Sequence, residues 1–230
     1  MPMCATVRVY DHIIQETPSR DKVKKVVPVS TFDQIESEGV ADITFNQSDK
    51  TEVVIIGPKN SLPFITVQSV GGVLKINTRK IGNKRIGKGV EVKVSAPALK
   101  RILNKGVGNI RFIPSLKTNS LQVNNYGVGN IHLPRLECTN LTVSNQGVGN
   151  LYFSGKVEKA SFQLEGVGDV NARELKALHV ELQQKGVGDM SCYAAETIKI
   201  SSKGAGNVVY YGHPRVLEFS KKGVGSVEAK

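Results

Sequence analysis

Gly106-Val107-Gly108-Asn109 is the first copy of a pattern that returns to the end of this 230-residue chain. The Gly-X-Gly pairs begin at residues 106, 127, 147, 166, 186, 204 and 223, so successive steps are 21, 20, 19, 20, 18 and 19 residues. Seven copies at a period near 20 residues are typical of a solenoid, in which each repeat packs on its neighbours. A solenoid accounts for the length without a domain boundary.

Between the glycine pairs, apolar residues alternate with polar ones, as at Ile110 and Phe112 and again at Leu121 and Val123. Alternation with period two predicts β-strands. Three short alternating runs in about 20 residues leave no room for a helix. The sequence therefore predicts an all-β fold: a single-stranded parallel β-helix with about three faces per coil, stacked at the ~4.8 Å spacing of neighbouring strands.

Each glycine corner needs either a backbone turn that a Cβ resists or a close backbone approach. The structural corner glycines are Gly106, Gly108, Gly127, Gly129, Gly147, Gly149, Gly166, Gly168, Gly186, Gly188, Gly204, Gly206, Gly223 and Gly225. We expect the residue between each pair to point into the core, as one inner column: Val107, Val128, Val148, Val167, Val187, Ala205 and Val224.

Two further columns follow from the same alignment of repeats. A second inner column consists of Ile110, Ile131, Leu151, Val170, Met190, Val208 and Val227. A polar ladder, whose side chains are expected to hydrogen-bond up and down the stack, consists of Asn109, Asn130, Asn150, Asp169, Asp189, Asn207 and Ser226. The ladder is interpreted as scaffold.

The chain before the regular repeats is less uniform. We expect an extension over residues 1–30, with a possible edge strand at Val7–Tyr10, and then one β-helix domain over residues 31–230. Within that domain, residues 31–100 form irregular coils and residues 101–230 the regular ones. Two alternating runs flank Gly71-Gly72 and predict a hairpin, so antiparallel strands should cap the N-terminal end of the stack.

At the other end, the open coil needs a cover. We expect residues 210–214 to fold across it and shield Val224 and Val227. The alternative is a second chain packed on this end. Lys221, Lys222 and Lys230 oppose such pairing through like-charge repulsion, so the prediction is a monomer or a weak homodimer.

The chain carries 31 basic and 20 acidic residues, a formal net charge of +11, which favours anionic partners such as acidic glycans, lipid headgroups or nucleic acid. No nucleic-acid motif is present, so no specific nucleic-acid partner is expected. Lys185, Lys203 and Lys222 each precede a corner and should stack as one stripe. Two interpretations stand: an anion-binding stripe, or a solvated edge of mutually repelling lysines.

A basic, glycine-rich loop at residues 81–89 could cradle phosphate, but it lacks the Gly-Lys-Ser/Thr ending of a phosphate loop. We interpret it as the tip of a surface hairpin. Tyr193, Tyr210 and Tyr211 lie near the C-terminal end, where they form an aromatic patch or pack beneath the loop around Gly212.

Asp169 and Asp189 offer the one argument for an enzyme, because carboxylates one strand spacing apart could act as general acid and base on a polysaccharide. Their column is otherwise asparagine, no histidine is in register, and the chain has no tryptophan. We therefore expect no catalytic residues, with a polysaccharide lyase or glycoside hydrolase acting on an acidic glycan as the alternative. A calcium site there is the third possibility, but asparagine neighbours supply few charges.

Histidines and cysteines show no common spacing. His12, His132, His179 and His213 differ in phase, as do Cys138 and Cys192, so no disulfide, metal or cofactor is expected. The residue type at the outward position of His132 differs strongly from coil to coil, which fits both a binding surface and an unconstrained solvent face.

No apolar run is long enough for a transmembrane helix, and Met1-Pro2-Met3-Cys4 lacks the features of a signal peptide. Two interpretations of Cys4 stay open, a former lipid-attachment cysteine and an ordinary free thiol.

Three groups of residues resemble a bacterial family called putative auto-transporter adhesin, head GIN domain. They are Phe32-Asp33-Gln34-Ile35 followed by Gly39-Val40-Ala41-Asp42-Ile43, the segment Val92–Leu99, and the Gly-Val-Gly-Asn/Asp corners. The resemblance covers residues 31–230. It implies a right-handed parallel β-helix in an exported or surface-attached protein, frequent in Bacteroidetes-type genomes, without catalytic residues to carry over. The predicted function is thus a non-enzymatic, extracytoplasmic binding or structural module, adhesin-like, with a glycan or another cell-surface component as partner.

Overall fold

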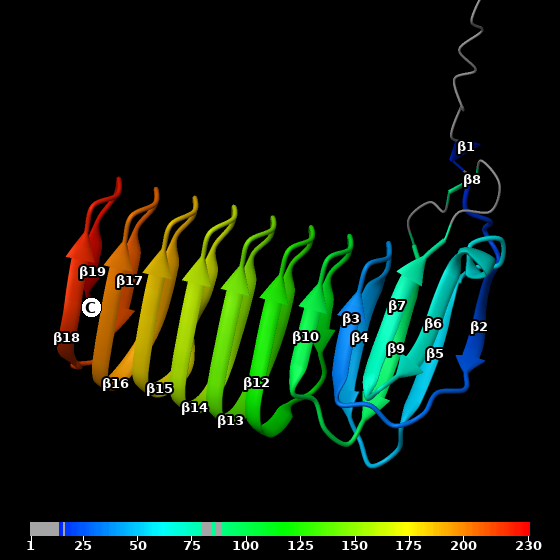
Figure 1. The fold of residues 1–230 in the computed structure, drawn as a ribbon, viewed down its shortest axis with the longest axis horizontal. Coiled ribbons are helices and arrows are strands. Elements are labelled where there is room, and N and C mark those ends of the chain that lie inside the picture. The colour runs from blue at the N-terminus through cyan, green and yellow to red at the C-terminus, as the bar shows by residue number, and fades with distance from the viewer. Residues whose placement is uncertain (1–13, 16, 80–83, 86–88) are drawn as a thin grey trace, which may run out of the picture.

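The computed structural model describes residues 14–15, 17–79, 84–85 and 89–230. The chain forms a β-solenoid in which parallel strands stack coil upon coil, about 20 residues apart, as the sequence predicts (Figure 1). The expected strand at Val7–Tyr10 and the cysteine at position 4 lie outside the described residues, as does most of the basic loop.

Parallel pairing continues through all the regular coils. Their strands are β10 (Arg101–Asn104), β11 (Ile110–Phe112), β12 (Leu116–Asn125), β13 (Ile131–Asn145), β14 (Leu151–Leu164), β15 (Val170–Gln184), β16 (Met190–Ser202), β17 (Val208–Tyr211), β18 (Arg215–Lys221) and β19 (Val227–Ala229). The register of β13 against β14 shifts between Leu133 and Leu136, and the pairing skips Thr139. These breaks divide a coil into three faces.

We name the faces by their position relative to the glycine corner. In one coil the first face is Leu121–Asn125, which runs into the corner at Gly127; the second face, residues 131–133, follows the corner; and the third face is residues 136–138. The glycine corners form a row along one edge of the solenoid, the upper edge in Figure 1.

The N-terminal end is built differently. Strands β3 (Gln34–Ser37) and β4 (Asp42–Gln47) pair in parallel with β10 and β11, and on their other side with β7 (Val73–Thr78) and β9 (Glu91–Ala96). Antiparallel strands then cover the end: β6 (Ile65–Val70) pairs with β7, β5 (Glu52–Pro58) with β9, and β2 (Lys22–Val27) with β5. The predicted hairpin around Gly71-Gly72 and the antiparallel cap are confirmed.

Two small elements complete this end. A 3₁₀ turn, η1 (Leu62–Phe64), precedes β6 and buries Leu62 and Phe64. A separate two-stranded parallel sheet joins β1 (Ile14–Gln15) to β8 (Lys84–Arg85).

The second inner column is confirmed, because its members from Ile110 to Val208 are buried, and Val227 packs against the same core. The column of corner valines, in contrast, was predicted wrongly. Val107, Val128, Val148, Val167 and Val187 are each 49–54% exposed, and Val224 is 77% exposed. The valines therefore form an outer ridge along the corner edge.

The close packing of the corners explains this orientation. A Cβ on Gly127 would lie 2.1 Å from the carbonyl oxygen of Gly106, and a Cβ on Gly129 would lie 1.9 Å from that of Gly108. Both glycines thus face the neighbouring coil, and the residue between them faces away from it, toward solvent. The backbone of Val128 still pairs in parallel with Val107 and Val148.

A row of buried polar side chains fills the interior behind the corners, where the sequence analysis placed valine. Nδ2 of Asn104 donates to Oδ1 of Asn125 at 2.8 Å, and Nδ2 of Asn125 donates to Oδ1 of Asn145 at 2.8 Å. Asn145 then donates to the carbonyl oxygen of Gly149 at 3.1 Å, and Gln184 donates likewise to Gly188 at 2.6 Å. These amides hold the corners from inside. The sequence analysis missed this row.

The prediction for the C-terminal end was also wrong. Residues 208–211 form β17, which pairs in parallel with β16 and β19 as part of the coil wall. Val208 and Tyr210 continue the positions of Met190 and Cys192, so these residues are used within a coil and do not fold across its end. These residues therefore leave the C-terminal end uncovered: Phe219 is 58% exposed and Val224 is 77% exposed.

Candidate functional site

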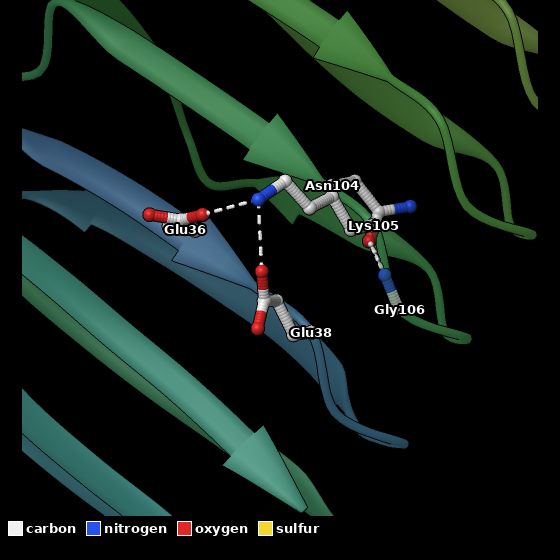
Figure 2. A network of polar contacts seen from close by, with 5 residues as sticks. All are labelled: Glu36, Glu38, Asn104, Lys105 and Gly106. Carbon is white, nitrogen blue, oxygen red and sulfur yellow. Dashed lines mark hydrogen bonds and ion pairs between the residues drawn. The ribbon is translucent and has the colours of Figure 1, made fainter.

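The residue just before each glycine corner directly follows the first face, and these residues form one row. We call this the pre-corner row: Glu38, Lys105, Tyr126, Gln146, Glu165, Lys185, Lys203 and Lys222. At its N-terminal end the positive charge is balanced. Nζ of Lys105 lies 2.7 Å from Oε1 of Glu36 and 2.8 Å from Oε1 of Glu38 (Figure 2). This contact raises the pKa of Lys105 and lowers the pKa of Glu36.

The C-terminal end of the row carries an excess of positive charge. Lys185, Lys203 and Lys222 occupy successive coils, so their side chains begin ~4.8 Å apart. Lys185 lies 2.8 Å from Glu165, and its hydrogen bond holds the pKa of that carboxyl below its usual range. Within the described residues Lys203 and Lys222 make no ion pair, and both are exposed.

These three lysines form one wall of a shallow groove of about 580 Å³ on the first face. We call it the lysine groove. Its floor consists of the uncharged polar residues Gln183, Ser201 and Ser220, and its opposite wall consists of Glu181, Lys199 and Glu218. Because every wall position repeats from coil to coil, the groove runs along the solenoid axis.

The opposite wall carries two glutamates and one lysine, so its net charge is negative. Nζ of Lys199 bonds to Oε1 of Glu218, and this hydrogen bond raises the pKa of Lys199. Glu181 accepts a hydrogen bond from Nε2 of Gln183 at 2.8 Å. The surplus of positive charge in the groove lies on the lysine wall, where an anion would find two unpaired ammonium groups one coil apart.

A larger depression, of about 760 Å³, lies on the third face around Thr118, Cys138 and Val157. Of its charged residues, Lys117 pairs with Glu137 at 3.0 Å, and Lys100 pairs with Asp33 at 2.6 Å. The pairing lowers the pKa of Glu137. Size favours this depression, but its lining carries three lysines against two glutamates, whereas the lysine groove carries four lysines against two glutamates. The lysine groove is therefore the better candidate for a charged ligand.

The polar ladder lies on the other side of the glycine corners, and in every regular coil it binds the backbone of the next coil. Oδ1 of Asn130 accepts the N–H of Asn150 at 2.8 Å, Oδ1 of Asp169 accepts that of Asp189 at 2.8 Å, and the same bond recurs in every regular coil. Asp169 and Asp189 are thus joined through one carboxylate oxygen, in the role that asparagine performs elsewhere. These hydrogen bonds hold neighbouring coils together, so the ladder has a structural role.

Replacing Asp169 by Asn should leave stability unchanged, because the amide oxygen accepts the same N–H. Replacing it by Ala should cost about 1 kcal/mol, the net value of one hydrogen bond. Thermal unfolding followed by circular dichroism measures both changes. Equal destabilisation by the two variants would contradict the scaffold role.

Other residues singled out from the sequence are dispersed. His132 contacts Tyr152 edge to face at 6.2 Å on the second face, and Nδ1 of His179 lies 2.8 Å from Oγ1 of Thr197. Tyr193 lies beneath Nζ of Lys176 at 3.7 Å. Among the residues that the structure describes, no group of three or more His, Cys, Asp or Glu side chains is placed to hold a metal ion.

The two described cysteines are poor nucleophiles at neutral pH. Burial raises the pKa of Cys138 to about 11 and that of Cys192 to about 12. Both thiols therefore stay protonated.

The fold defines a class of protein, a parallel β-solenoid with an antiparallel N-terminal cap. The chain belongs to the family described as putative auto-transporter adhesin, head GIN domain, whose model matches residues 31–214. A putative adhesin from Bacteroides fragilis NCTC 9343 is similar in structure, with a TM-score of 0.89 and 33% sequence identity over 94% of this chain and 100% of that one.

More distant structures share the fold. A putative adhesin from Parabacteroides distasonis ATCC 8503 has a TM-score of 0.72 at 19% identity, and a putative lipid binding protein from the same organism has a TM-score of 0.67 at 22% identity. Each covers 94% of this chain and 100% of its own. No curated protein matches the chain. The described residues contain no helix long and apolar enough to cross a lipid bilayer.

Proposed function

We propose that this protein is a non-enzymatic binding module that holds an extended anionic ligand, an acidic glycan, along the lysine groove. The observation that carries this proposal is the stacking of Lys185, Lys203 and Lys222 beside a polar, uncharged floor. A linear polymer with regularly spaced charges places one anion near each lysine, because a pyranose repeat is close in length to the ~4.8 Å spacing of the coils. Serine and glutamine on the floor offer hydrogen bonds to sugar hydroxyls.

The proposed setting is outside the cytoplasm, at the cell surface or in the periplasm. The family description as an adhesin supports this setting and supports a non-enzymatic role. The ladder bond between Asp169 and Asp189 supports the same role, because it commits one oxygen of Asp169 to the fold.

Binding of acidic polysaccharides tests the proposal. Polygalacturonate and dextran sulfate should bind, neutral dextran should not, and affinity should fall as salt rises because exposed charges are screened. Lys203→Glu combined with Lys222→Glu should weaken binding by about tenfold or more, since each reversal replaces an attraction by a repulsion of up to ~1 kcal/mol. Lys50→Glu makes the same charge change at an exposed lysine outside the groove and is the matched control.

The opposite effect is expected from Glu165→Gln. This change releases Lys185 from its ion pair, so affinity for dextran sulfate should rise by up to about fivefold. Equal loss of binding in the Lys50→Glu control, or equal binding of neutral dextran, would overturn the proposal. Cleavage of a polysaccharide that Asp169→Asn or Asp189→Asn abolishes would instead establish an enzyme.

A further inference from the structure

The C-terminal end of the solenoid presents a free strand edge. Strand β18 pairs with β16 on one side, and within the described residues no strand pairs with its other side. Three apolar side chains are exposed here: Val216 by 42%, Leu217 by 46% and Phe219 by 58%. Val216 and Phe219 pair with the buried Ile198 and Ile200, so they are the open end of the core. A free edge of this kind is a surface to which another strand can add.

The backbone of this edge is ready to pair. In the earlier coils, the carbonyl of the residue just before the pre-corner row accepts an N–H from the next coil. Gln184 accepts that of Lys203 at 2.7 Å, and Ser202 accepts that of Lys222 at 2.7 Å. Lys221 holds the same position in the last coil, and its carbonyl accepts no such bond within the described part of the chain. An added parallel strand would continue the series by donating an N–H to Lys221.

The side chain of Lys221 differs from all others in its row. In every earlier coil the position is uncharged and buried: Ser37, Asn104, Asn125, Asn145, Leu164, Gln184 and Ser202. Lys221 pairs with Ser202, shares its inward direction, and is exposed. A strand added here would enclose the ammonium, which is unfavourable unless that strand supplies a carboxylate. The edge is therefore selective for a strand with an acidic residue opposite Lys221.

A second copy of this chain does not meet that condition. Glu218, the one acidic residue of β18, pairs with Lys199 on the outward side and bonds to its Nζ. At the opposite end of the solenoid, β2 contains no acidic residue and directs Lys25 inward, opposite the buried Ile55. Pairing between these strands of two copies leaves Lys221 without a carboxylate. The occupant that fits is a strand of different sequence.

We propose that β18 binds an extended segment of another protein as an added parallel strand, with an acidic residue opposite Lys221 and apolar residues opposite Phe219 and Val216. Main-chain hydrogen bonds to the free edge supply affinity, and the carboxylate supplies specificity. The segment lies beside β18, at the end of the stack. The lysine groove lies on the outer surface of the first face, so the two sites are separate.

Binding of synthetic peptides tests the proposal. The probe is a fluorescein-labelled peptide, Thr-Val-Thr-Val-Thr-Glu-Thr, whose glutamate aligns with Lys221 and whose second valine aligns with Phe219. A second peptide carries lysine in place of glutamate. Fluorescence anisotropy should show about tenfold tighter binding of the glutamate peptide, because the exchange turns an attraction into a repulsion. Lys221→Glu should reverse this preference.

A third peptide tests the main-chain bond. Proline in place of the last threonine removes the N–H that bonds to the carbonyl of Lys221, so binding should weaken by about fivefold. Equal binding of the proline peptide would show that the segment does not add as a strand, and would overturn the proposal.

Lys24→Glu is the matched control for Lys221→Glu. It makes the same charge change at an exposed lysine of β2, on the outward side and at the other end of the solenoid. This variant should keep the preference for the glutamate peptide. No binding of the glutamate peptide, equal binding of the glutamate and lysine peptides, or an unchanged preference in Lys221→Glu would each contradict the proposed site.

Sedimentation velocity of the protein alone tests the alternative occupant. The wild-type chain should be a monomer. A dimer that Phe219→Lys dissociates would place a second copy of the chain on this edge, and the proposal would then be wrong.

Discussion

Gly147→Ala should destabilise the protein by about 4 kcal/mol or more, a loss at the upper end of what a single methyl group causes. A Cβ at this position would lie 2.1 Å from the carbonyl oxygen of Gly127 and 2.8 Å from the carbonyl carbon of Tyr126. Both atoms belong to backbone, so no side chain can move aside. Relief requires the two coils to separate, which breaks the bond from Val148 N–H to Gly127 at 2.9 Å.

The matched control is Gly71→Ala in the β6–β7 hairpin. Gly71 has a φ of +59°, and a Cβ there meets nothing within 4 Å. The cost should be the conformational one, about 1 kcal/mol. Urea denaturation followed by circular dichroism compares the two variants. If Gly147→Ala unfolds at the same urea concentration as Gly71→Ala, close coil contact does not limit the corner.

Asn125→Ala should be the second most damaging change, at about 2 to 5 kcal/mol. Asn125 is fully buried between Asn104 and Asn145. Its removal leaves the Nδ2 of one neighbour and the Oδ1 of the other without their partner, and each buried orphan costs about 1 to 3 kcal/mol. Denaturant midpoints and the melting temperature measure the loss.

Asn124→Ala provides the comparison within the same strand. Asn124 is 7% exposed, and its side chain makes no hydrogen bond within the described part of the chain. Its replacement should stay within about 1 kcal/mol of wild type. Similar losses for the two variants would show that the amide row contributes little beyond ordinary packing.

The repeat architecture could be predicted from the sequence because its signals are redundant. The glycine pairs fix the period, the alternation of Leu121 and Val123 fixes the strands, and Gly71-Gly72 marks the hairpin. The first two signals repeat several times, so irregular coil lengths do not obscure them, and the third is local.

The orientation of the corners was missed because hydrophobicity and alternation disagree there. Alternation continues through the corner: residues 121, 123, 125, 127, 131 and 133 are buried, whereas Tyr126, Val128 and Asn130 are exposed. Counting by two through the glycines identifies Asn125 as buried. Hydrophobicity instead predicts that Val128 is buried and Asn125 exposed. That prediction fails because the buried asparagine side chains of neighbouring coils hydrogen-bond to one another.

The lysine groove was predictable only in part. The spacing of Lys185, Lys203 and Lys222 predicts their stacking, but the sequence does not reveal which lysines are neutralised. Lys105 occupies the same row and is paired with two glutamates that precede it by more than 60 residues. Such an ion pair depends on which coil lies next to which in the stack, and the local sequence does not show this.

Coil length varies from 18 to 21 residues, yet the glycine corners stay aligned from Val107 to Val224. The register shifts fall elsewhere. Three lie at the bend from the second to the third face, between Leu133 and Leu136, between Tyr152 and Ser154, and between Ala172 and Lys176; two lie beyond it, between Ala177 and His179 and between Ile198 and Lys199. The solenoid thus has one edge of fixed geometry, and the bend from the second to the third face accepts extra residues most often. An epitope or a whole domain inserted at the bend from the second to the third face should leave the neighbouring coils in place. One residue added at a glycine corner should displace them.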